Sequence, residues 1–256
     1  MLYEAVCAPA SYMVSGDPHQ KRSEENLEEI MKRLCLLLVF LCIMPVATSI
    51  ADGPEKPDLA IPKGALVIVS EWSFEGDTPK GFTKEVKVEP AQAELEGSFI
   101  RLSSKKSSFG FKKEIEFSVK EYPYVHWSWQ ARTLPKGGDV RKRDTDDQAG
   151  QLYLLFPRFP AKLNTRILGY LWENETPKGT MGTSTAWSKA KYVVLRDKTD
   201  PLDMWQKESR NAYEDYKKLF EEEPPELGSV SIYINSQHTG TEAEILFGPI
   251  YFTREP

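Results

Sequence analysis

The sequence predicts a mostly β protein, a two-sheet antiparallel β-sandwich of jelly-roll or lectin-like type with one packed α-helix. Three observations lead to this prediction. Short segments alternate apolar with polar residues, glycine and proline turns separate them, and a single segment repeats its apolar residues at helical spacing. About ten strands are expected, and because one twisted sheet rarely holds so many, two packed sheets are favoured.

The region before the β pattern predicts export. Lys32 and Arg33 are followed by an apolar run and then by small residues, which is the form of a secretory signal peptide over residues 31–51. Because Met31 stands directly before the basic pair, we expect translation to begin there and residues 1–30 to be a non-native upstream extension. The apolar run is short for a membrane span, so cleavage is favoured over an uncleaved anchor. We therefore expect a periplasmic or secreted protein with no stable membrane span after cleavage.

Cysteine content and charge narrow the function classes. Cys7, Cys35 and Cys42 all precede the predicted cleavage point, so the mature chain offers no disulfide scaffold, cysteine-based zinc site or cysteine nucleophile. Residues 1–51 carry four basic and six acidic residues, and their removal changes the formal net charge from -5 to -3. An acidic chain without a basic stripe argues against nucleic acid as a partner.

The mature chain is predicted to form one domain after a short leader. Residues 52–65 contain three prolines and few large apolar residues, which indicates an extended leader. A single β-sandwich domain is expected over residues 66–254. The predicted strands cover residues 66–69, 72–74, 86–88, 99–102, 109–119, 125–131, 152–156, 167–172, 192–195, 230–235 and 244–252.

The tryptophans divide into core residues and one surface candidate. Trp127 and Trp129 fall on the apolar face of segment 125–131, so the core is favoured over a sugar-binding role for them. Trp172 is considered as a platform too, although most tryptophans of a sandwich lie in the core. Trp187 lies among turn residues, and an exposed aromatic ring can stack on the apolar face of a sugar. Trp187 is therefore the better platform for a ligand.

One segment predicts the single helix, because its apolar positions recur at helical spacing. These positions are Trp205, Ser209, Ala212, Tyr216, Leu219 and Phe220. Asp200 or Asp203 is expected to cap the start of the helix, and Pro224 with Pro225 to end it. The apolar stripe is expected to pack on the sandwich.

Several short motifs follow one another in a specific order along the predicted domain. They are Trp127-x-Trp129, Leu134-Pro135, Gly138-Asp139, Asp146-Asp147, Tyr170-x-Trp172, Pro177-Lys178-Gly179-Thr180, the segment from Glu208 to Tyr216, and Pro224-Pro225. In this order the chain resembles the uncharacterised bacterial family known as domain of unknown function 3047 (DUF3047), over residues 66–254. The resemblance implies an exported, mostly β domain and brings no established activity.

A loop rich in aspartate is the first candidate site. Asp144, Asp146 and Asp147 can offer oxygen ligands to a hard cation such as calcium. The alternative is a solvated loop whose acids offset the basic residues 141–143. Where the resemblance implies an acidic loop, segment 235–240 is neutral, and this argues against a complete calcium site. No other cofactor is expected.

The same aspartates enter a catalytic hypothesis. Asp146 or Asp147 with Glu173, which follows Trp172 at a predicted strand end, can form the carboxylate pair of a glycoside hydrolase. Such a pair needs a defined separation, which a sequence does not supply. We therefore favour a non-catalytic protein and keep these residues as catalytic candidates.

A ligand-binding role is also considered for Asp147, Arg210 and Asn211. The guanidinium of Arg210 suits a carboxylate ligand, and Asn211 stands beside it. The structural alternative is that both residues tie the helix to the sheet.

Together these observations predict non-catalytic binding of a carbohydrate or cell-envelope ligand. One alternative is an envelope carbohydrate-active hydrolase or lyase that uses Asp146, Asp147 and Glu173. Another is a structural component of an envelope complex. The sequence makes no prediction of oligomeric state, and the preference for a sugar depends on analogy with other sandwiches, which is a weak argument for function.

Overall fold

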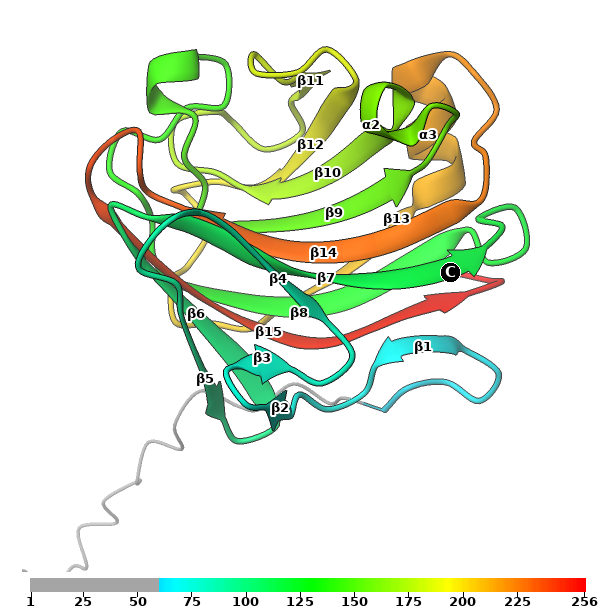
Figure 1. The fold of residues 1–256 in the computed structure, drawn as a ribbon, viewed down its shortest axis with the longest axis horizontal. Coiled ribbons are helices and arrows are strands. Elements are labelled where there is room, and N and C mark those ends of the chain that lie inside the picture. Colours follow the sequence, from blue (N-terminus) through cyan, green and yellow to red (C-terminus); the bar gives the residue numbers. More distant parts are fainter. Residues whose placement is uncertain (1–59) are drawn as a thin grey trace, which may run out of the picture. The chain divides into compact units, whose positions relative to one another are not determined.

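The protein is seen in a computed structural model that describes residues 60–256. Figure 1 shows two β-sheets that face each other across a shared core, and this confirms the predicted mostly β, two-sheet sandwich. The predicted upstream extension, the signal peptide and residues 52–59 of the leader lie outside the described residues. Within residues 60–256 no helix is long and apolar enough to cross a membrane.

One sheet has six strands in the order β13-β8-β15-β6-β5, with β1 paired to β15. Its strands are β1 (Leu66–Val69), β5 (Gln92–Glu96), β6 (Phe99–Lys105), β8 (Tyr124–Thr133), β13 (Gln206–Asn211) and β15 (Glu242–Thr253). The outer face of this sheet carries charged side chains such as Arg132, which pairs with Glu96. The inner face packs on the second sheet.

The second sheet has seven strands in the order β11-β12-β10-β9-β14-β7-β4. Its strands are β4 (Thr83–Val88), β7 (Ser108–Phe117), β9 (Gly150–Phe156), β10 (Arg166–Trp172), β11 (Met181–Thr183), β12 (Ala190–Arg196) and β14 (Leu227–Asn235). A two-stranded ribbon of β2 (Phe74–Glu75) and β3 (Thr78–Pro79) precedes β4. Two short helical turns, η1 (Arg143–Thr145) and α2 (Ala161–Asn164), lie in loops.

The pair formed by β10 and β12 is parallel, which the predicted antiparallel sandwich did not include. The cause is β11, which pairs antiparallel with the outer edge of β12. Because the chain reverses in β11 and again before β12, β12 runs in the same direction as β10. The connection from β10 to β12, residues 173–189, thus includes β11.

The core contains the tryptophans that the sequence assigned to it. Trp127, Trp129 and Trp172 are buried, with ring centroids 5.4 Å apart for the first two and 5.6 Å apart for the last two. Trp129 also donates a hydrogen bond from Nε1 to Glu208 on β13. The assignment of Trp127 and Trp129 to the core is confirmed, because both sheets contribute to one apolar cluster.

The helix α3 spans Ala212–Phe220, so the predicted start near Asp200 or Asp203 is wrong. Residues 206–211 form β13 instead, which pairs with β8 along its whole length. Without β13, one edge of β8 would lack backbone hydrogen-bond partners, and the backbone of β13 provides them. Alternate side chains of β13 are half-buried. The cap is Asn211, whose side chain accepts a hydrogen bond from the Glu214 backbone N–H.

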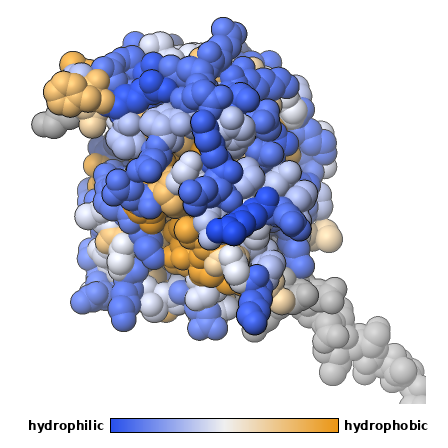
Figure 2. Space-filling view, turned by 90° about the vertical axis from the view of Figure 1, so that its right-hand side faces the viewer, coloured by the Kyte–Doolittle hydropathy of each residue, from blue (hydrophilic) through white to orange (hydrophobic). Residues whose placement is uncertain are grey.

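A buried ion pair connects α3 to both sheets. Asp215 on α3 accepts two hydrogen bonds from Arg210 on β13, at 2.9 and 2.6 Å. It accepts a third, at 2.9 Å, from the hydroxyl of Tyr170 on β10. Figure 2 shows that the side lying to the right in Figure 1 is mostly hydrophilic, with an apolar area near its middle and a smaller apolar group at its upper left.

Candidate functional site

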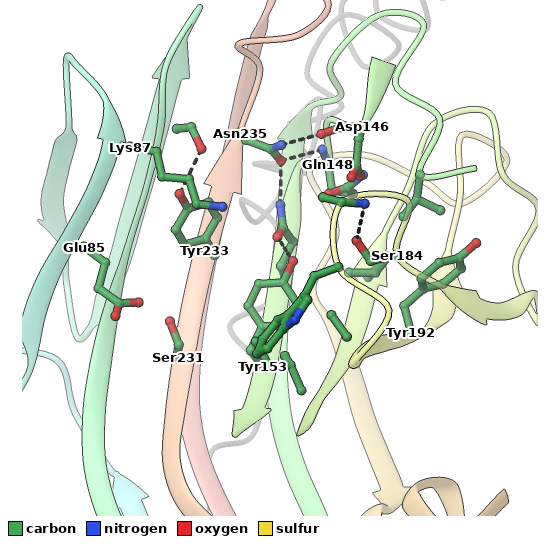
Figure 3. A pocket seen from close by; sticks show the side chains of 18 of the residues that line it. Glu85, Lys87, Asp146, Gln148, Tyr153, Ser184, Tyr192, Ser231, Tyr233 and Asn235 are labelled. Atoms are coloured by element: carbon green, nitrogen blue, oxygen red, sulfur yellow. Dashed lines mark hydrogen bonds between the residues drawn. The ribbon is translucent and has the colours of Figure 1, made fainter. Parts of the chain in front are cut away.

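A pocket of about 350 Å³ opens on the outer face of the seven-stranded sheet (Figure 3). Strand alternation creates this face, because Leu152 and Leu154 of β9 enter the core while Gln151, Tyr153 and Leu155 line the pocket. We call it the tyrosine pocket. Its polar and aromatic lining residues are Glu85, Lys87, Ser108, Asp146, Gln148, Gln151, Tyr153, Ser184, Trp187, Lys191, Tyr192, Ser231, Tyr233, Asn235, Gln237 and His238.

Three tyrosines form the floor of the pocket, and each lies against a glycine directly across from it on a neighbouring strand. A side chain at any of these glycines would collide with the tyrosine, since an added Cβ would come within 2.3, 2.7 and 2.5 Å of its ring or hydroxyl. The glycines therefore let the rings lie close to the backbone of the sheet. The pairs are Gly110 with Tyr233, Gly169 with Tyr153, and Gly182 with Tyr192.

Trp187 reaches the pocket from the loop between β11 and β12. The loop turns at Ser184, whose hydroxyl accepts a hydrogen bond from the Ala186 backbone N–H at 3.1 Å. Trp187 is half-buried, so part of its ring is open to solvent. The indole is thus placed as a ligand platform requires, and its binding role stays a prediction.

Asn235 organises the polar end of the pocket (Figure 3). Its Oδ1 accepts hydrogen bonds from the Gln148 backbone N–H and the Gln151 side chain, and its Nδ2 donates to the Asp146 carbonyl. Tyr153 donates its hydroxyl to Gln151. These bonds fix the orientation of the amides and of the floor, so the site is formed in advance of any ligand.

Asp146 is the aspartate of the candidate loop that faces the pocket. Its Oδ1 accepts a hydrogen bond from Gln148 Nε2 at 2.8 Å, and its Oδ2 has no hydrogen-bond partner in the described part of the chain. Burial raises the pKa of this carboxyl above its usual range. Asp146 can therefore accept a hydrogen bond from a ligand hydroxyl.

Asp147 points away from the pocket and holds the loop after β14. Its carboxylate accepts hydrogen bonds from the His238 backbone N–H, the Thr239 backbone N–H and the Thr239 hydroxyl, at 3.2, 2.6 and 2.8 Å. The loop thus faces this aspartate with donors, whereas a cation site needs oxygen ligands. Asp144 is exposed, and within residues 60–256 no three acidic, histidine or cysteine side chains gather as a metal site requires. The structure therefore does not bring the three aspartates together.

Glu173 is buried below the pocket and does not line it. Its carboxylate accepts hydrogen bonds from the backbone N–H groups of Val140, Asn174 and Thr176 and from Gln148 Nε2. Burial raises its pKa to about 7, although these donors favour the charged form. Gln148 Nε2 joins Glu173 to Asp146, but a hydrolytic pair needs both carboxyl groups to face the substrate.

Arg210 and Asn211 do not line the tyrosine pocket. Arg210 is engaged with Asp215, and Asn211 caps α3, which is the structural alternative considered from the sequence. Sequence reasoning missed the floor tyrosines and Asn235. The available signal was a glycine inside two of the predicted strands, Gly110 and Gly169, whereas Gly182 lies outside every predicted strand. Pairing each glycine with a tyrosine also requires the strand register.

Two buried polar atoms of the pocket have no hydrogen-bond partner within residues 60–256. They are Ser231 Oγ and Gln237 Oε1. Ser231 is only 2% exposed and lies on β14, two residues before Tyr233 on the same face. A buried hydroxyl without a partner is unfavourable by about 1–3 kcal/mol, and a ligand that supplies the partner would recover this energy.

The family model described as "Protein of unknown function (DUF3047)" matches residues 72–251. This confirms the resemblance found in the sequence. No curated protein matches the chain.

Solved structures with similar folds include enzymes and binding modules. The xyloglucanase domain of NopAA from Sinorhizobium fredii is 13% identical, with a TM-score of 0.41, over 70% of this chain and 95% of that one. A cellulase derived from Cel12A of Rhodothermus marinus is 13% identical, with a TM-score of 0.42, over 67% and 92%. A family 11 carbohydrate-binding module from Clostridium thermocellum is 7% identical, with a TM-score of 0.35, over 72% and 94%. Because these identities and TM-scores are low, we draw no functional conclusion from them.

Proposed function

We propose that this chain, which belongs to the DUF3047 family of proteins of unknown function, binds a carbohydrate in the tyrosine pocket without catalysing a reaction on it. The observation that carries the proposal is the partnerless hydroxyl of Ser231 on an aromatic floor. A sugar presents apolar ring faces and hydroxyl edges, so it needs aromatic surface and hydrogen-bonding groups side by side. The pocket provides both.

The size of the pocket limits the ligand. Small-molecule sites have volumes of about 300–1,000 Å³, and the tyrosine pocket lies near the lower end. We therefore expect it to hold one or two sugar rings, such as the end of a longer cell-envelope glycan. Asp146 Oδ2 and Gln237 Oε1 would accept hydrogen bonds from the hydroxyl groups, and Ser231 would donate or accept one.

Export belongs to the same proposal. We expect the signal peptide to place the protein in the periplasm or outside the cell, where envelope glycans are found. N-terminal sequencing of the protein purified from culture fractions would test this, since a chain that begins after residue 49 or 51 is expected.

Replacement of Trp187 by alanine is expected to weaken glycan binding about tenfold, because the variant loses ring contacts with the sugar. A glycan array on the purified protein would first identify the ligand, and calorimetry would then measure its Kd. Trp205→Ala is the matched control, since Trp205 is also half-buried but packs against Phe99 and does not line the pocket. An array without any bound glycan, or equal Kd values for both variants, would contradict the proposal.

Ser231→Ala is expected to lower glycan affinity about tenfold while leaving the free energy of unfolding unchanged or slightly higher. The reason is that the Ser231 hydroxyl stabilises nothing in the unliganded fold. Ser108→Ala is the comparison, because that hydroxyl bonds to Tyr233 at 2.9 Å and its loss should lower stability by about 1 kcal/mol. Urea denaturation and calorimetry on the same samples separate the two effects. A Ser231→Ala protein that is less stable and binds normally would show a structural role instead.

A hydrolytic function has one supporting observation, the raised pKa of Asp146 at the pocket wall. Asp147 and Glu173 do not line the pocket, because both are turned into hydrogen-bonded surroundings. The other carboxyl group that lines it, Glu85 on β4, lies on the opposite side from Asp146 (Figure 3). Reducing-end assays on every glycan that binds would detect hydrolysis.

A further inference from the structure

We infer that the sugar bound in the tyrosine pocket carries a carboxylate, and that Lys87 is the residue that selects it. The inference rests on the proposed function and names the ligand class more closely. A uronic acid differs from the matching neutral hexose by a carboxylate in place of a hydroxymethyl group. A single well-placed cation can therefore distinguish the two.

Lys87 lies on the edge strand β4 and reaches over the floor of the pocket (Figure 3). Its Nζ lies 5.5 Å from the centroid of the Tyr233 ring, a distance at which the ring attracts the cation. Tyr233 is itself fixed by the hydrogen bond to Ser108 and by its contact with Gly110. The ammonium of this exposed lysine lies over the ring and, among residues 60–256, makes no hydrogen bond and no ion pair.

Neighbouring lysines differ from Lys87 because each is already engaged. Lys84 pairs with Asp77 at 3.0 Å, Lys112 pairs with Glu114 at 3.0 Å, Lys113 donates to the Ile68 carbonyl at 2.6 Å, and Lys191 donates to the Leu219 carbonyl. Lys191 also lines the pocket, so an engaged lysine and an unengaged one are found in the same site. Of these lysines only Lys87 has neither a hydrogen-bond nor an ion-pair partner, and its charge acts at longer range on Asp146.

The acidic groups of the pocket do not neutralise Lys87 by contact. Glu85, two residues earlier on β4, is 3.5 Å from Lys112 Nζ. Asp146 is held by Gln148, and no carboxylate of the described chain lies within 4.0 Å of Lys87 Nζ. A ligand carboxylate would bring the partner that the protein does not supply.

Ser231 gives a second group for the same ligand. This residue lines the pocket on the strand that carries Tyr233, and its hydroxyl is buried without a partner. A carboxylate has two oxygens that only accept hydrogen bonds, so it suits a lysine ammonium or a serine hydroxyl. A neutral sugar supplies no such partner for the ammonium.

The test compares matched sugars on wild-type protein, Lys87→Gln and Lys84→Gln. The probes are methyl glycosides of glucose and glucuronate, galactose and galacturonate, and mannose and mannuronate, with Kd measured by calorimetry at low and at high salt. We expect a uronate to bind about tenfold more tightly than its neutral partner, and this preference to shrink at high salt. Lys87→Gln is expected to remove the preference while the neutral sugar keeps its Kd. Lys84→Gln, whose lysine pairs with Asp77 outside the pocket, should behave as wild type.

Each outcome decides between two statements. Equal binding of neutral and acidic sugars, unaffected by Lys87→Gln, would overturn the selection of a carboxylate and leave the proposed sugar binding intact. Failure of every sugar to bind, on this panel and on the array, would overturn both. The melting curve of Lys87→Gln should match wild type, because Lys87 makes no hydrogen bond or ion pair in the unliganded fold. Lys84→Gln loses only an exposed ion pair with Asp77, so its melting temperature should fall slightly at most.

Discussion

Replacing Trp129 with alanine is expected to lower the free energy of unfolding by about 3–5 kcal/mol. Trp129 is completely buried, and its ring contacts Trp127, Trp172 and Phe247, with centroids 5.4, 5.6 and 6.1 Å away. Alanine would leave a cavity between the two sheets and remove the hydrogen bond from Nε1 to Glu208. Urea denaturation followed by circular dichroism would measure the loss.

Trp205→Ala serves as the control for this measurement. Trp205 is half-buried at the start of β13 and has one ring neighbour, Phe99, at 4.4 Å. Its removal should lower stability by about 1 kcal/mol. Equal losses for Trp129→Ala and Trp205→Ala would contradict the assignment of Trp129 to the centre of the core.

The fold could be predicted from the sequence where local pattern decides it. Alternation in segment 125–131 predicted both the strand β8 and its buried face, because a side chain in a strand points to one face or the other. Local pattern predicted the wrong element for β13. Trp205 and Ser209 continue the helical spacing of Ala212 and Tyr216, so the sequence predicted a helix there. Pairing with β8 makes this segment a strand. A local pattern cannot reveal such a pairing, because the paired residues are about 80 positions apart.

The candidate site shows the same division between local and long-range information. Trp187 and Asp146 were both identified from their local setting, and both line the pocket. Asp147, adjacent to Asp146, points away from the pocket and bonds to the loop at Thr239. Outside regular strands, the spacing of residues in the sequence does not define where their side chains point. The tyrosine floor was not predicted, because its glycines make sense only once the strands are in register.

Titration of Glu173 is expected to make the protein less stable as the pH rises from about 4.5 to about 7. Burial raises the pKa of this carboxyl in the fold to about 7, from an ordinary value of 4.5. Below pH 4.5 the group is protonated in both the folded and unfolded chains, and its contribution to stability is complete. As the pH rises the unfolded chain ionises first, so the free energy of unfolding falls by about 3 kcal/mol and then levels off above pH 7.

The comparison with Glu173→Gln isolates this effect, because glutamine has the same shape and does not ionise. Urea denaturation of both proteins at several pH values should give a difference in unfolding free energy that changes between pH 4.5 and 7. Asp146 titrates in both proteins and largely cancels. Parallel curves would mean that Glu173 is ionised throughout, because the three backbone N–H groups and Gln148 outweigh burial. Gln148 would then stand between two carboxylates at neutral pH, and its donated hydrogen bonds would be what keeps the charged Asp146 at the pocket wall.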